Sequence, residues 1–311
     1  MAHLFPDFAR ARIRTSGAEI HVRVAGDGPP LLLLHGYPQT HAMWHRLAPV
    51  LARDFTVVVP DLRGYGDSSR PSSGLRCANY AKRVMALDQV EVMAALGFER
   101  FMVAGHDRGG RVTHRMALDH PERVLRAAVI DIVPTLQVFD QVDQETATRY
   151  FHWFFLAQPH PLPERMIGAD PEHWLRGRLA AWGRTKRAFH PAAVAEYVRC
   201  FSHPDSLRAT CDDYRAGAGI DLEHDRAETG RVTAPLLALW GALGFVGQHY
   251  DVIASWQAVA DDVQGVGLPC GHFVPEEQPR ETLNLLTEFF LGATAPLTHA
   301  LPDANVHHVA G

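Results

Sequence analysis

Short apolar runs recur along the chain, separated by longer stretches in which apolar positions follow a helical spacing. Short runs rich in Val, Leu and Ile are typical of parallel strands that are buried on both faces. Five such runs predict the central strands, at residues 31–34, 56–59, 101–104, 127–130 and 236–240. The alternation of strands and helices predicts an α/β fold with a mostly parallel sheet and helices on both faces.

Two of the intervening stretches have recognisable helix ends. Residues 80–96 are followed by Gly97, and residues 111–119 are followed by His120-Pro121. Glycine is common just after a helix, and proline disfavours helical backbone in the residue before it. Both stretches are therefore predicted to be helices.

The pattern changes between residues 138 and 224. Strand-like runs disappear, aromatic residues and helical spacings replace them, and strand character returns only near residue 235. We interpret 138–224 as a helical cap domain inserted into a core made of residues 1–137 and 225–291. Residues 292–311 contain Ala, Pro and Thr without periodicity, which predicts a tail outside the core.

Composition narrows the classes of function. A formal net charge of -5 in 311 residues lacks the basic field of nucleic-acid binders, so neither nucleic acid nor an anionic membrane is expected as a partner. No run approaches the roughly 18 apolar residues of a membrane span, and no signal-peptide pattern opens the chain. The four cysteines are scattered, which favours reduced thiols and a cytoplasmic protein.

The most informative motif is Gly105-His106-Asp107-Arg108-Gly109, between the run at 101–104 and a helical pattern from Arg111. Strand, sharp turn and helix are typical of a nucleophile elbow, whose usual Gly-x-Ser-x-Gly here has Asp in place of Ser. A carboxylate is suited to displacing a leaving group from a saturated carbon, which leaves an alkyl ester on the enzyme. The motif alone is moderately specific, because Gly-His-Asp also occurs in ordinary turns.

Two earlier loops are placed to complete a site around Asp107. His35-Gly36-Tyr37-Pro38 follows the run at 31–34, and residues 60–68 follow the run at 56–59. The backbone N–H groups of Tyr37 and Arg108 are expected to form an oxyanion hole. The turn at 64–68 is expected only to shape the site.

A base and an acid are expected later in the chain. His272 lies in Cys270-Gly271-His272-Phe273, in a predicted loop before a helix that begins around Glu276. The order nucleophile, acid, histidine requires a carboxylate between positions 107 and 272, and Asp131 ends the apolar run at 127–130. An Asp after a strand can also be a simple turn cap, so Asp221 and Asp225 remain alternative acids.

Metal and cofactor chemistry are not indicated. His41 and His45 have the i, i+4 spacing of helical metal ligands, but no Glu follows the first one and no third ligand is evident. The chain also lacks a Gly-x-Gly-x-x-Gly motif between a strand and a helix. We therefore expect neither a metal nor a nucleotide cofactor.

These segments together resemble the fluoroacetate dehalogenases, the haloacetate dehalogenases of the α/β-hydrolase superfamily. The resemblance covers nearly the whole chain up to about residue 291 and rests on residues 35–40, 106–112, 131–135, 150–153, 213–216 and 271–273. It implies the α/β-hydrolase fold with a helical cap, and it suggests a homodimer. Tyr37 departs from the family, which often has Phe there.

The resemblance also implies roles for the residues that match. Asp107 is implied as the nucleophile, His272 as the base and Asp131 as the acid that orients it. Arg108 and Arg111 are implied to bind a substrate carboxylate. Their spacing supports this role, because residues three apart lie about one helical turn from each other beside the nucleophile.

A halide site is implied at His152, Trp153 and Tyr214. Each of these side chains carries an N–H or O–H donor that can meet a developing anion. The reaction expected is the hydrolysis of a small haloacid, fluoroacetate to glycolate and halide, through an ester on Asp107.

Three rival functions remain open. A haloalkane dehalogenase or an epoxide hydrolase of the same fold uses the same Asp nucleophile, and Tyr150, Tyr197 and Tyr214 could protonate an opening epoxide ring. A neutral substrate would leave Arg108 and Arg111 without an anion to pair with. A non-catalytic receptor on the same fold would not need a complete hydrolytic apparatus.

Overall fold

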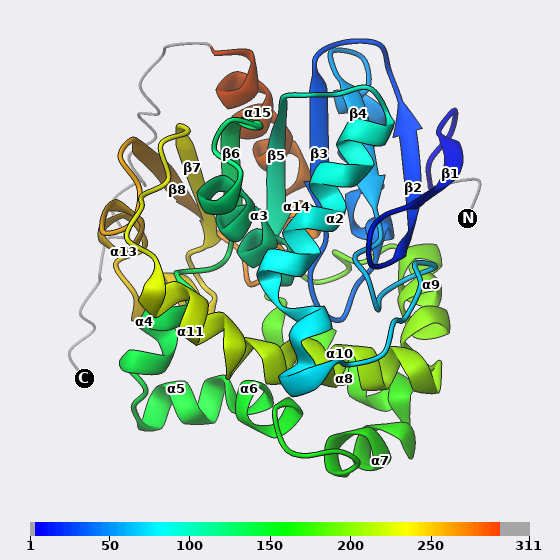
Figure 1. Cartoon of the computed structure of the whole chain (residues 1–311), viewed down its shortest axis with the longest axis vertical. Coiled ribbons are helices and arrows are strands. Elements are labelled where there is room, and N and C mark those ends of the chain that lie inside the picture. The colour runs from blue at the N-terminus through cyan, green and yellow to red at the C-terminus, as the bar shows by residue number, and fades with distance from the viewer. Residues whose placement is uncertain (1–3, 293–311) are drawn as a thin grey trace, which may run out of the picture.

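The computed structural model describes residues 4–292, which are built around one eight-stranded sheet (Figure 1). The strand order is β1-β2-β4-β3-β5-β6-β7-β8. Strand β2 pairs antiparallel with β1 and β4, and every pair from β4 to β8 is parallel. The bounds are Ala9–Arg14 (β1), Glu19–Ala25 (β2), Pro30–Leu34 (β3), Thr56–Pro60 (β4), Phe101–His106 (β5), Val124–Ile130 (β6), Leu236–Gly241 (β7) and Val263–Leu268 (β8).

The five strands predicted from apolar runs are β3 to β7, which occupy the middle of the sheet. Every residue of β4 and β5 is buried, as expected for strands covered on both faces. Sequence analysis missed β1 and β2 at one side of the sheet and β8 at the other. Strand β1 alternates between exposed and half-buried residues, polar His21 and Arg23 separate the apolar residues of β2, and β8 contains two glycines, so none of them forms a continuous apolar run.

Helices cover both faces of the sheet. In Figure 1, α2 and α3 lie in front of the strands and α15 lies behind them. The bounds are His41–Trp44 (η1, a 3-10 helix), Ala48–Leu51 (α1), Leu75–Tyr80 (η2, a 3-10 helix), Lys82–Ala95 (α2), Arg108–Asp119 (α3), Phe245–His249 (α12), Val252–Gln257 (α13), Val274–Glu277 (α14) and Pro279–Leu291 (α15).

Three predicted helix starts need correction. The helix expected at 80–96 begins at Lys82, because Ala81 has extended backbone (ψ 143°). The helix expected at 111–119 begins at Arg108, directly after the turn at Asp107. The helix expected near Glu276 is divided into α14 and α15, because Gln278 leaves the helical region with φ -131°.

Eight helices connect β6 to β7 and lie together beyond one end of the strands, at the bottom of Figure 1. The first and last of them cross the expected cap boundaries, so the division at 138 and 224 stays a prediction. The expected tail lies outside the described residues apart from Gly292. The bounds are Thr135–Asp140 (α4), Gln144–Arg149 (α5), Phe151–Leu156 (α6), Leu162–Gly168 (α7), Pro171–Trp182 (α8), Pro191–Phe201 (α9), Pro204–Gly217 (α10) and Ile220–Ala227 (α11).

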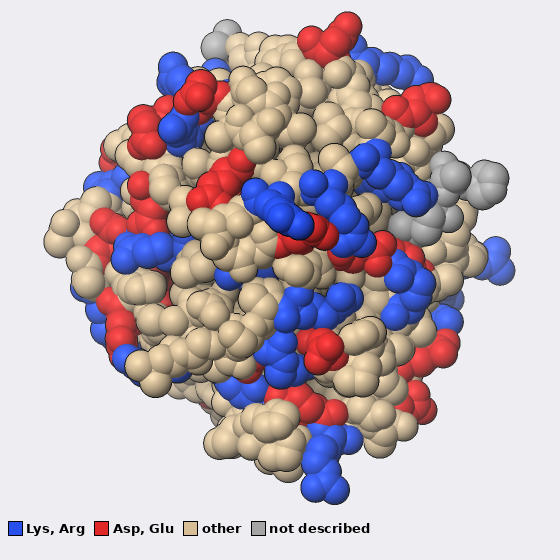
Figure 2. All heavy atoms as spheres, turned by 45° about the vertical axis from the view of Figure 1, so that its right-hand side comes forward, with Lys and Arg blue, Asp and Glu red and all other residues tan. Residues whose placement is uncertain are grey.

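The surface drawn in Figure 2 carries basic and acidic side chains next to one another. Within residues 4–292, no helix combines the length and the apolar character that crossing a membrane requires. The parallel strands carry their loops to a common edge of the sheet, where the segments after β3, β5, β6 and β8 meet. That edge faces the helices between β6 and β7 and holds the candidate site.

Candidate active site

Asp107 occupies the sharp turn between β5 and α3. Its backbone has φ 49° and ψ -115°, a region that non-glycine residues rarely adopt. The turn is held on both sides, since Asp107 N donates to Ile130 O at 3.1 Å and Arg111 N donates to Asp107 O at 3.1 Å. Gly109 makes the close approach possible, because a Cβ there would lie 2.4 Å from His35 O. The elbow geometry predicted from the motif is therefore present.

The Asp107 carboxylate meets a backbone N–H from the loop after β3. Tyr37 N donates to Oδ1 at 2.8 Å, and Gly36 leaves room for this contact, since a Cβ there would lie 2.7 Å from Oδ1. Burial raises the pKa of Asp107, but two neighbouring histidines, Arg108 and the Tyr37 N–H outweigh burial and hold that pKa below its usual value. The side chain is therefore an ionised carboxylate at neutral pH.

The His272 ring lies between the carboxylates of Asp107 and Asp131, which the sequence predicts as its partners. Its Nδ1 lies 2.6 Å from Asp131 Oδ2, and its Nε2 lies 3.9 Å from Asp107 Oδ2. Burial lowers the pKa of His272, but the hydrogen bond to Asp131 and the charges of both carboxylates raise it above its usual value. The Nε2 distance is too long for a direct hydrogen bond, so the two groups face each other across a gap.

Asp131 is oriented by a second hydrogen bond. Gly241 N donates to Asp131 Oδ1 at 2.9 Å. Burial raises the pKa of Asp131, and the bonds from His272 and Gly241 oppose that rise. The alternative acids lie elsewhere: Asp221 Oδ1 accepts from Lys82 N, and Asp225 lies 3.6 Å from Arg115 Nη1. Asp131 is therefore the acid that the structure brings to His272.

Arg108 already has a carboxylate partner that sequence analysis missed. Its Nε and Nη2 donate to the two oxygens of Asp213 at 2.9 and 2.7 Å, and its guanidinium lies 4.3 Å from the Tyr214 ring centre. These two hydrogen bonds use the Nε and Nη2 side of the planar guanidinium, so Nη1 does not donate to the Asp213 carboxylate. Asp213 is adjacent to Tyr214 in the sequence, but only the fold places it against Arg108.

Arg111 has no such counter-ion within residues 4–292. Its Nη1 donates to Val133 O at 3.1 Å and to Thr135 Oγ1 at 2.8 Å, while its buried Nε has no described partner. Burial and the neighbouring Arg108 lower its pKa. A buried cation held only by neutral groups is costly, and an anionic ligand would relieve that cost.

The three residues implied in halide binding converge from two helices. His152 and Trp153 lie on α6 and Tyr214 lies on α10, with ring centres 5.9 Å (His152 to Tyr214) and 6.4 Å (Trp153 to Tyr214) apart. Within the described residues, His152 Nδ1 and Tyr214 Oη are buried without hydrogen-bond partners. Burial holds the pKa of His152 well below its usual value, so its neutral ring keeps one N–H donor.

A cavity of about 260 Å³ opens onto these groups. Asp107, Asp131, His152, Trp153 and His272 are among the residues that line it. Several other cavity residues were not among the predicted site residues, and Arg178 and Trp182 are two of them. The centre of the Trp182 ring lies 4.5 Å from the ring centre of His152 and 5.5 Å from that of His272. No local motif marks Arg178 or Trp182, because both lie on α8, a different helix from the one that carries His152.

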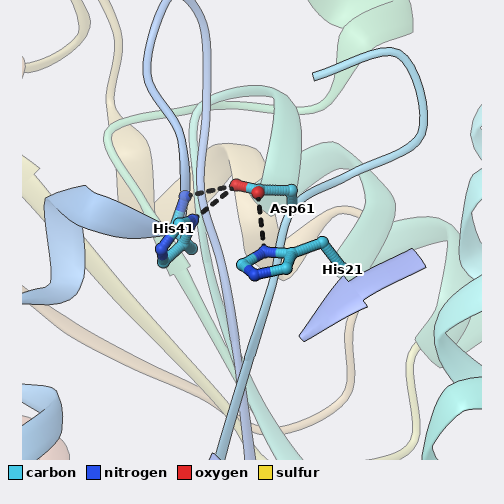
Figure 3. A group of neighbouring side chains, drawn as sticks. All are labelled: His21, His41 and Asp61. Atoms are coloured by element: carbon cyan, nitrogen blue, oxygen red, sulfur yellow. Dashed lines mark hydrogen bonds and ion pairs between the residues drawn. The ribbon is translucent and has the colours of Figure 1, made fainter. Parts of the chain in front are cut away.

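A histidine and carboxylate cluster lies on the β2 side of the sheet edge (Figure 3). His21 Nδ1 and His41 Nδ1 lie 3.0 and 2.9 Å from the Asp61 oxygens, which also accept from the backbone N–H groups of His41 and Asp67. Asp61 is thus saturated by four donors at hydrogen-bond lengths. The cluster fits a buried network that holds the loops together. His45 is separate, with its Nδ1 donating to Ala42 O.

A carboxylate elbow after a central parallel strand, with a histidine and acid pair from later loops, defines the protein as an α/β hydrolase. A family model described as alpha/beta hydrolase fold matches residues 29–279. A fluoroacetate dehalogenase from Burkholderia sp. is 45% identical over 93% of this chain and 96% of its own length. The chain belongs to the haloacetate dehalogenase family of the α/β-hydrolase superfamily.

Other relatives show how close neighbouring activities lie. A soluble epoxide hydrolase from Corynebacterium sp. (strain C12) is 37% identical over 88% of this chain and 94% of its own length. A crystal structure of a putative α/β hydrolase from Nostoc sp. PCC 7120 is 57% identical with a TM-score of 0.90, covering 91% of this chain and 98% of its own. These relatives therefore show the family and the hydrolase class, but they do not show whether the bond cleaved is a carbon–halogen bond or an epoxide C–O bond.

Proposed function

We propose that the protein hydrolyses haloacetates, converting fluoroacetate to glycolate and halide through an ester on Asp107. The observation that carries the proposal is Arg111, a buried guanidinium one helical turn from the nucleophile with no described counter-ion. A haloacetate brings a carboxylate to this cation and a carbon–halogen bond to Asp107. The relationship to a fluoroacetate dehalogenase supports the same substrate class.

In the first step, Asp107 Oδ2 attacks the carbon that bears the halogen. Oδ1 is held by the Tyr37 N–H, so Oδ2 is the oxygen free to react. The new C–O bond forms as the C–X bond breaks, and the electron pair leaves with the halide toward His152, Trp153 and Tyr214. Arg111 and the free Nη1 of Arg108 hold the substrate carboxylate and aim its carbon.

In the second step, water attacks the ester carbonyl carbon of Asp107. His272 Nε2 takes the proton of this water while Asp131 holds the ring. The N–H groups of Tyr37 and Arg108 stabilise the oxyanion. As the intermediate collapses, the bond between the Asp107 carboxyl carbon and the glycolate oxygen breaks, and His272 gives its proton to that oxygen. The carboxylic acid left on Asp107 then loses its proton to solvent, which restores the carboxylate.

Ester formation also prepares the base. The charge of the Asp107 carboxylate contributes to the raised pKa of His272, after burial and the contacts to Asp131. Esterification removes that charge, so the pKa of His272 falls at the point where a neutral imidazole is needed. The sequence of the two steps thus shifts His272 toward its basic form.

The test compares a charged and a neutral substrate of matched size. Wild type is expected to release chloride from chloroacetate much faster than from chloroacetamide. Replacing Arg111→Leu should lower kcat/KM for chloroacetate by about a hundredfold and leave the slow rate on chloroacetamide nearly unchanged. Asp107→Asn is the inactive control. Equal rates on both substrates in wild type, or an equal loss on both in the Arg111 variant, would contradict the proposal.

Epoxide hydrolysis is the second candidate. It is favoured by the relationship to the Corynebacterium enzyme and by Tyr150, which lines the cavity beside His152 at 5.5 Å between ring centres. A neutral epoxide would leave Arg111 unpaired. Diol formation from a terminal epoxide, insensitive to Arg111→Leu and without halide release from any haloacid, would support this function instead. A non-catalytic receptor would form no ester on Asp107.

A further inference from the structure

Glu277 is a buried carboxylate, and among the described residues only backbone N–H groups bind it. It is the last residue of α14 and is 5% exposed. Its Oε2 accepts from Gly271 N at 3.0 Å, Arg184 N at 2.7 Å and Thr185 N at 2.8 Å, and its Oε1 accepts from Phe273 N at 3.0 Å. Four donors and no acceptor surround it, which suits an ionised carboxylate because a protonated one would have to donate.

These four N–H groups come from two distant segments. Gly271 and Phe273 flank the base His272, and Arg184 and Thr185 follow α8 among the helices between β6 and β7. The segments also touch directly, because His272 N donates to Trp182 O at 3.0 Å. We call residues 271–273 the base loop and residues 182–185 the α8 exit.

The base loop determines where the His272 ring can act. Asp131 fixes Nδ1, while Nε2 faces Asp107 Oδ2 across 3.9 Å. Errors of about 1 Å in the position of a reacting group can cost about a hundredfold in rate. The backbone on both sides of His272 is therefore a place where small displacements matter, and Glu277 is bonded to both sides.

We propose that Glu277 is a positioning residue that fixes the base loop against the α8 exit, so that His272 can activate water against the Asp107 ester. This inference rests on the proposed function. Displacement of halide by Asp107 needs no proton transfer, whereas hydrolysis of the ester needs His272 as a base. Loss of Glu277 should therefore slow ester hydrolysis more than ester formation.

Glu276 offers a matched control one residue away. It is also buried, but its carboxyl contacts Gln39 and Tyr197 and none of the four N–H groups. Burial raises the pKa of Glu276 to about 8, against the opposing hydrogen bonds. Gln has the same side-chain length, so Glu276→Gln keeps the size of this residue. Glu276→Gln changes a neighbouring buried glutamate without disturbing the base loop.

The kinetic experiment follows halide release and ester content after chloroacetate is added to wild type, Glu277→Gln and Glu276→Gln. For Glu277→Gln we expect a halide burst, accumulation of carboxymethylated protein by intact mass, and a steady-state rate lowered by about ten- to a hundredfold. Glu276→Gln should show neither burst nor accumulation. Halide release and ester hydrolysis slowed equally in Glu277→Gln, or both unchanged, would overturn the proposal.

A second readout needs no turnover at all. The negative charge of Glu277 contributes to the raised pKa of His272, after burial, Asp131 and Asp107. NMR titration of the His272 ring without substrate should give a lower pKa in Glu277→Gln than in wild type, and no change in Glu276→Gln. An unchanged His272 titration in folded Glu277→Gln would overturn the inference. Absence of halide release in wild type would instead overturn the proposed function.

Glu277→Asp covers the case in which Glu277→Gln fails to fold. It keeps the charge but shortens the side chain by one methylene, so it cannot reach both segments equally. We expect it to accumulate ester while the His272 titration stays close to wild type. No ester accumulation in this variant, with turnover equal to wild type, would overturn the positioning role.

Discussion

Arg108 and Arg111 are three residues apart, yet their surroundings differ. Arg108 is paired with Asp213 through two hydrogen bonds, whereas Arg111 lies against neutral oxygens and the Trp153 ring, 4.4 Å from its centre. Pairing with Asp213 stabilises one cation within the fold. The other remains free for an anion, and we therefore expect Arg111 to contribute more to substrate binding than Arg108.

Trp153 tests whether the halide site is adapted to fluoride. Its ring packs between Arg111 and Tyr150, which alone would make it a packing residue. Trp153→Phe keeps an aromatic ring and deletes the N–H donor. Fluoride is the strongest hydrogen-bond acceptor among the halides, and one donor to a developing anion contributes about 3 kcal/mol. We expect fluoroacetate turnover to fall by about a hundredfold, and bromoacetate turnover far less.

The two rates are measured with an ion electrode in wild type and variant. A packing role would lower both rates by the same factor, since it would disturb the cavity for every substrate. Equal losses would remove Trp153 from the halide site.

At the scale of elements, the elbow depends on how closely α3 approaches the loop after β3. A Cβ on Gly109 would lie 2.4 Å from His35 O and 2.7 Å from Leu34 O, both backbone atoms that cannot swing aside. Gly109→Ala should therefore shift the start of α3, destabilise the protein by about 1–3 kcal/mol and reduce turnover more than tenfold. Thermal unfolding and halide release measure the two effects.

Gly177 in α8 is the matched control for this substitution. A Cβ there would meet nothing within 4 Å. Because Ala favours helices over Gly by about 1 kcal/mol, Gly177→Ala should raise the melting temperature and leave turnover unchanged. A Gly109→Ala variant as stable and active as Gly177→Ala would contradict the steric argument.

At the scale of the whole molecule, the unpaired Arg111 links stability to substrate binding. A ligand that binds only the folded state stabilises it, by about 2.7 kcal/mol at a hundred times its Kd. Glycolate should therefore raise the melting temperature of wild type by several degrees, whereas the neutral glycolamide should not. Arg111→Met removes a buried cation that has no counter-ion within residues 4–292, so it should not lower the melting temperature of the free protein and should abolish the glycolate effect.

Differential scanning fluorimetry measures these shifts. Equal glycolate shifts in wild type and Arg111→Met would show that the anion binds elsewhere. A large drop in the melting temperature of the free variant would show that Arg111 stabilises the fold and is not held at a cost.

The central strands β3 to β7 and the elbow at Asp107 can be predicted from the sequence, because both follow from residues adjacent in the chain. An apolar run buried on both faces and a strand–turn–helix motif are local patterns. The order of Asp107, Asp131 and His272 was also readable, and the fold brings these three together at the sheet edge. Strands β1, β2 and β8 were missed, because polar residues alternate with apolar ones in β1 and β2 and two glycines interrupt β8.

The contacts that those residues make with distant parts of the chain depend on the folded structure. Asp213 lies more than 100 positions from Arg108, to which it is paired. Trp182 lies 90 positions before His272, and its carbonyl accepts the His272 N–H. Glu277 binds the N–H group of Arg184, which is more than 90 positions away. Such contacts depend on how the helices between β6 and β7 settle on the sheet edge, and a single sequence carries no local signal for that packing. The same packing directs Asp213 to Arg108, so that no counter-ion for Arg111 is present in the described part of the chain.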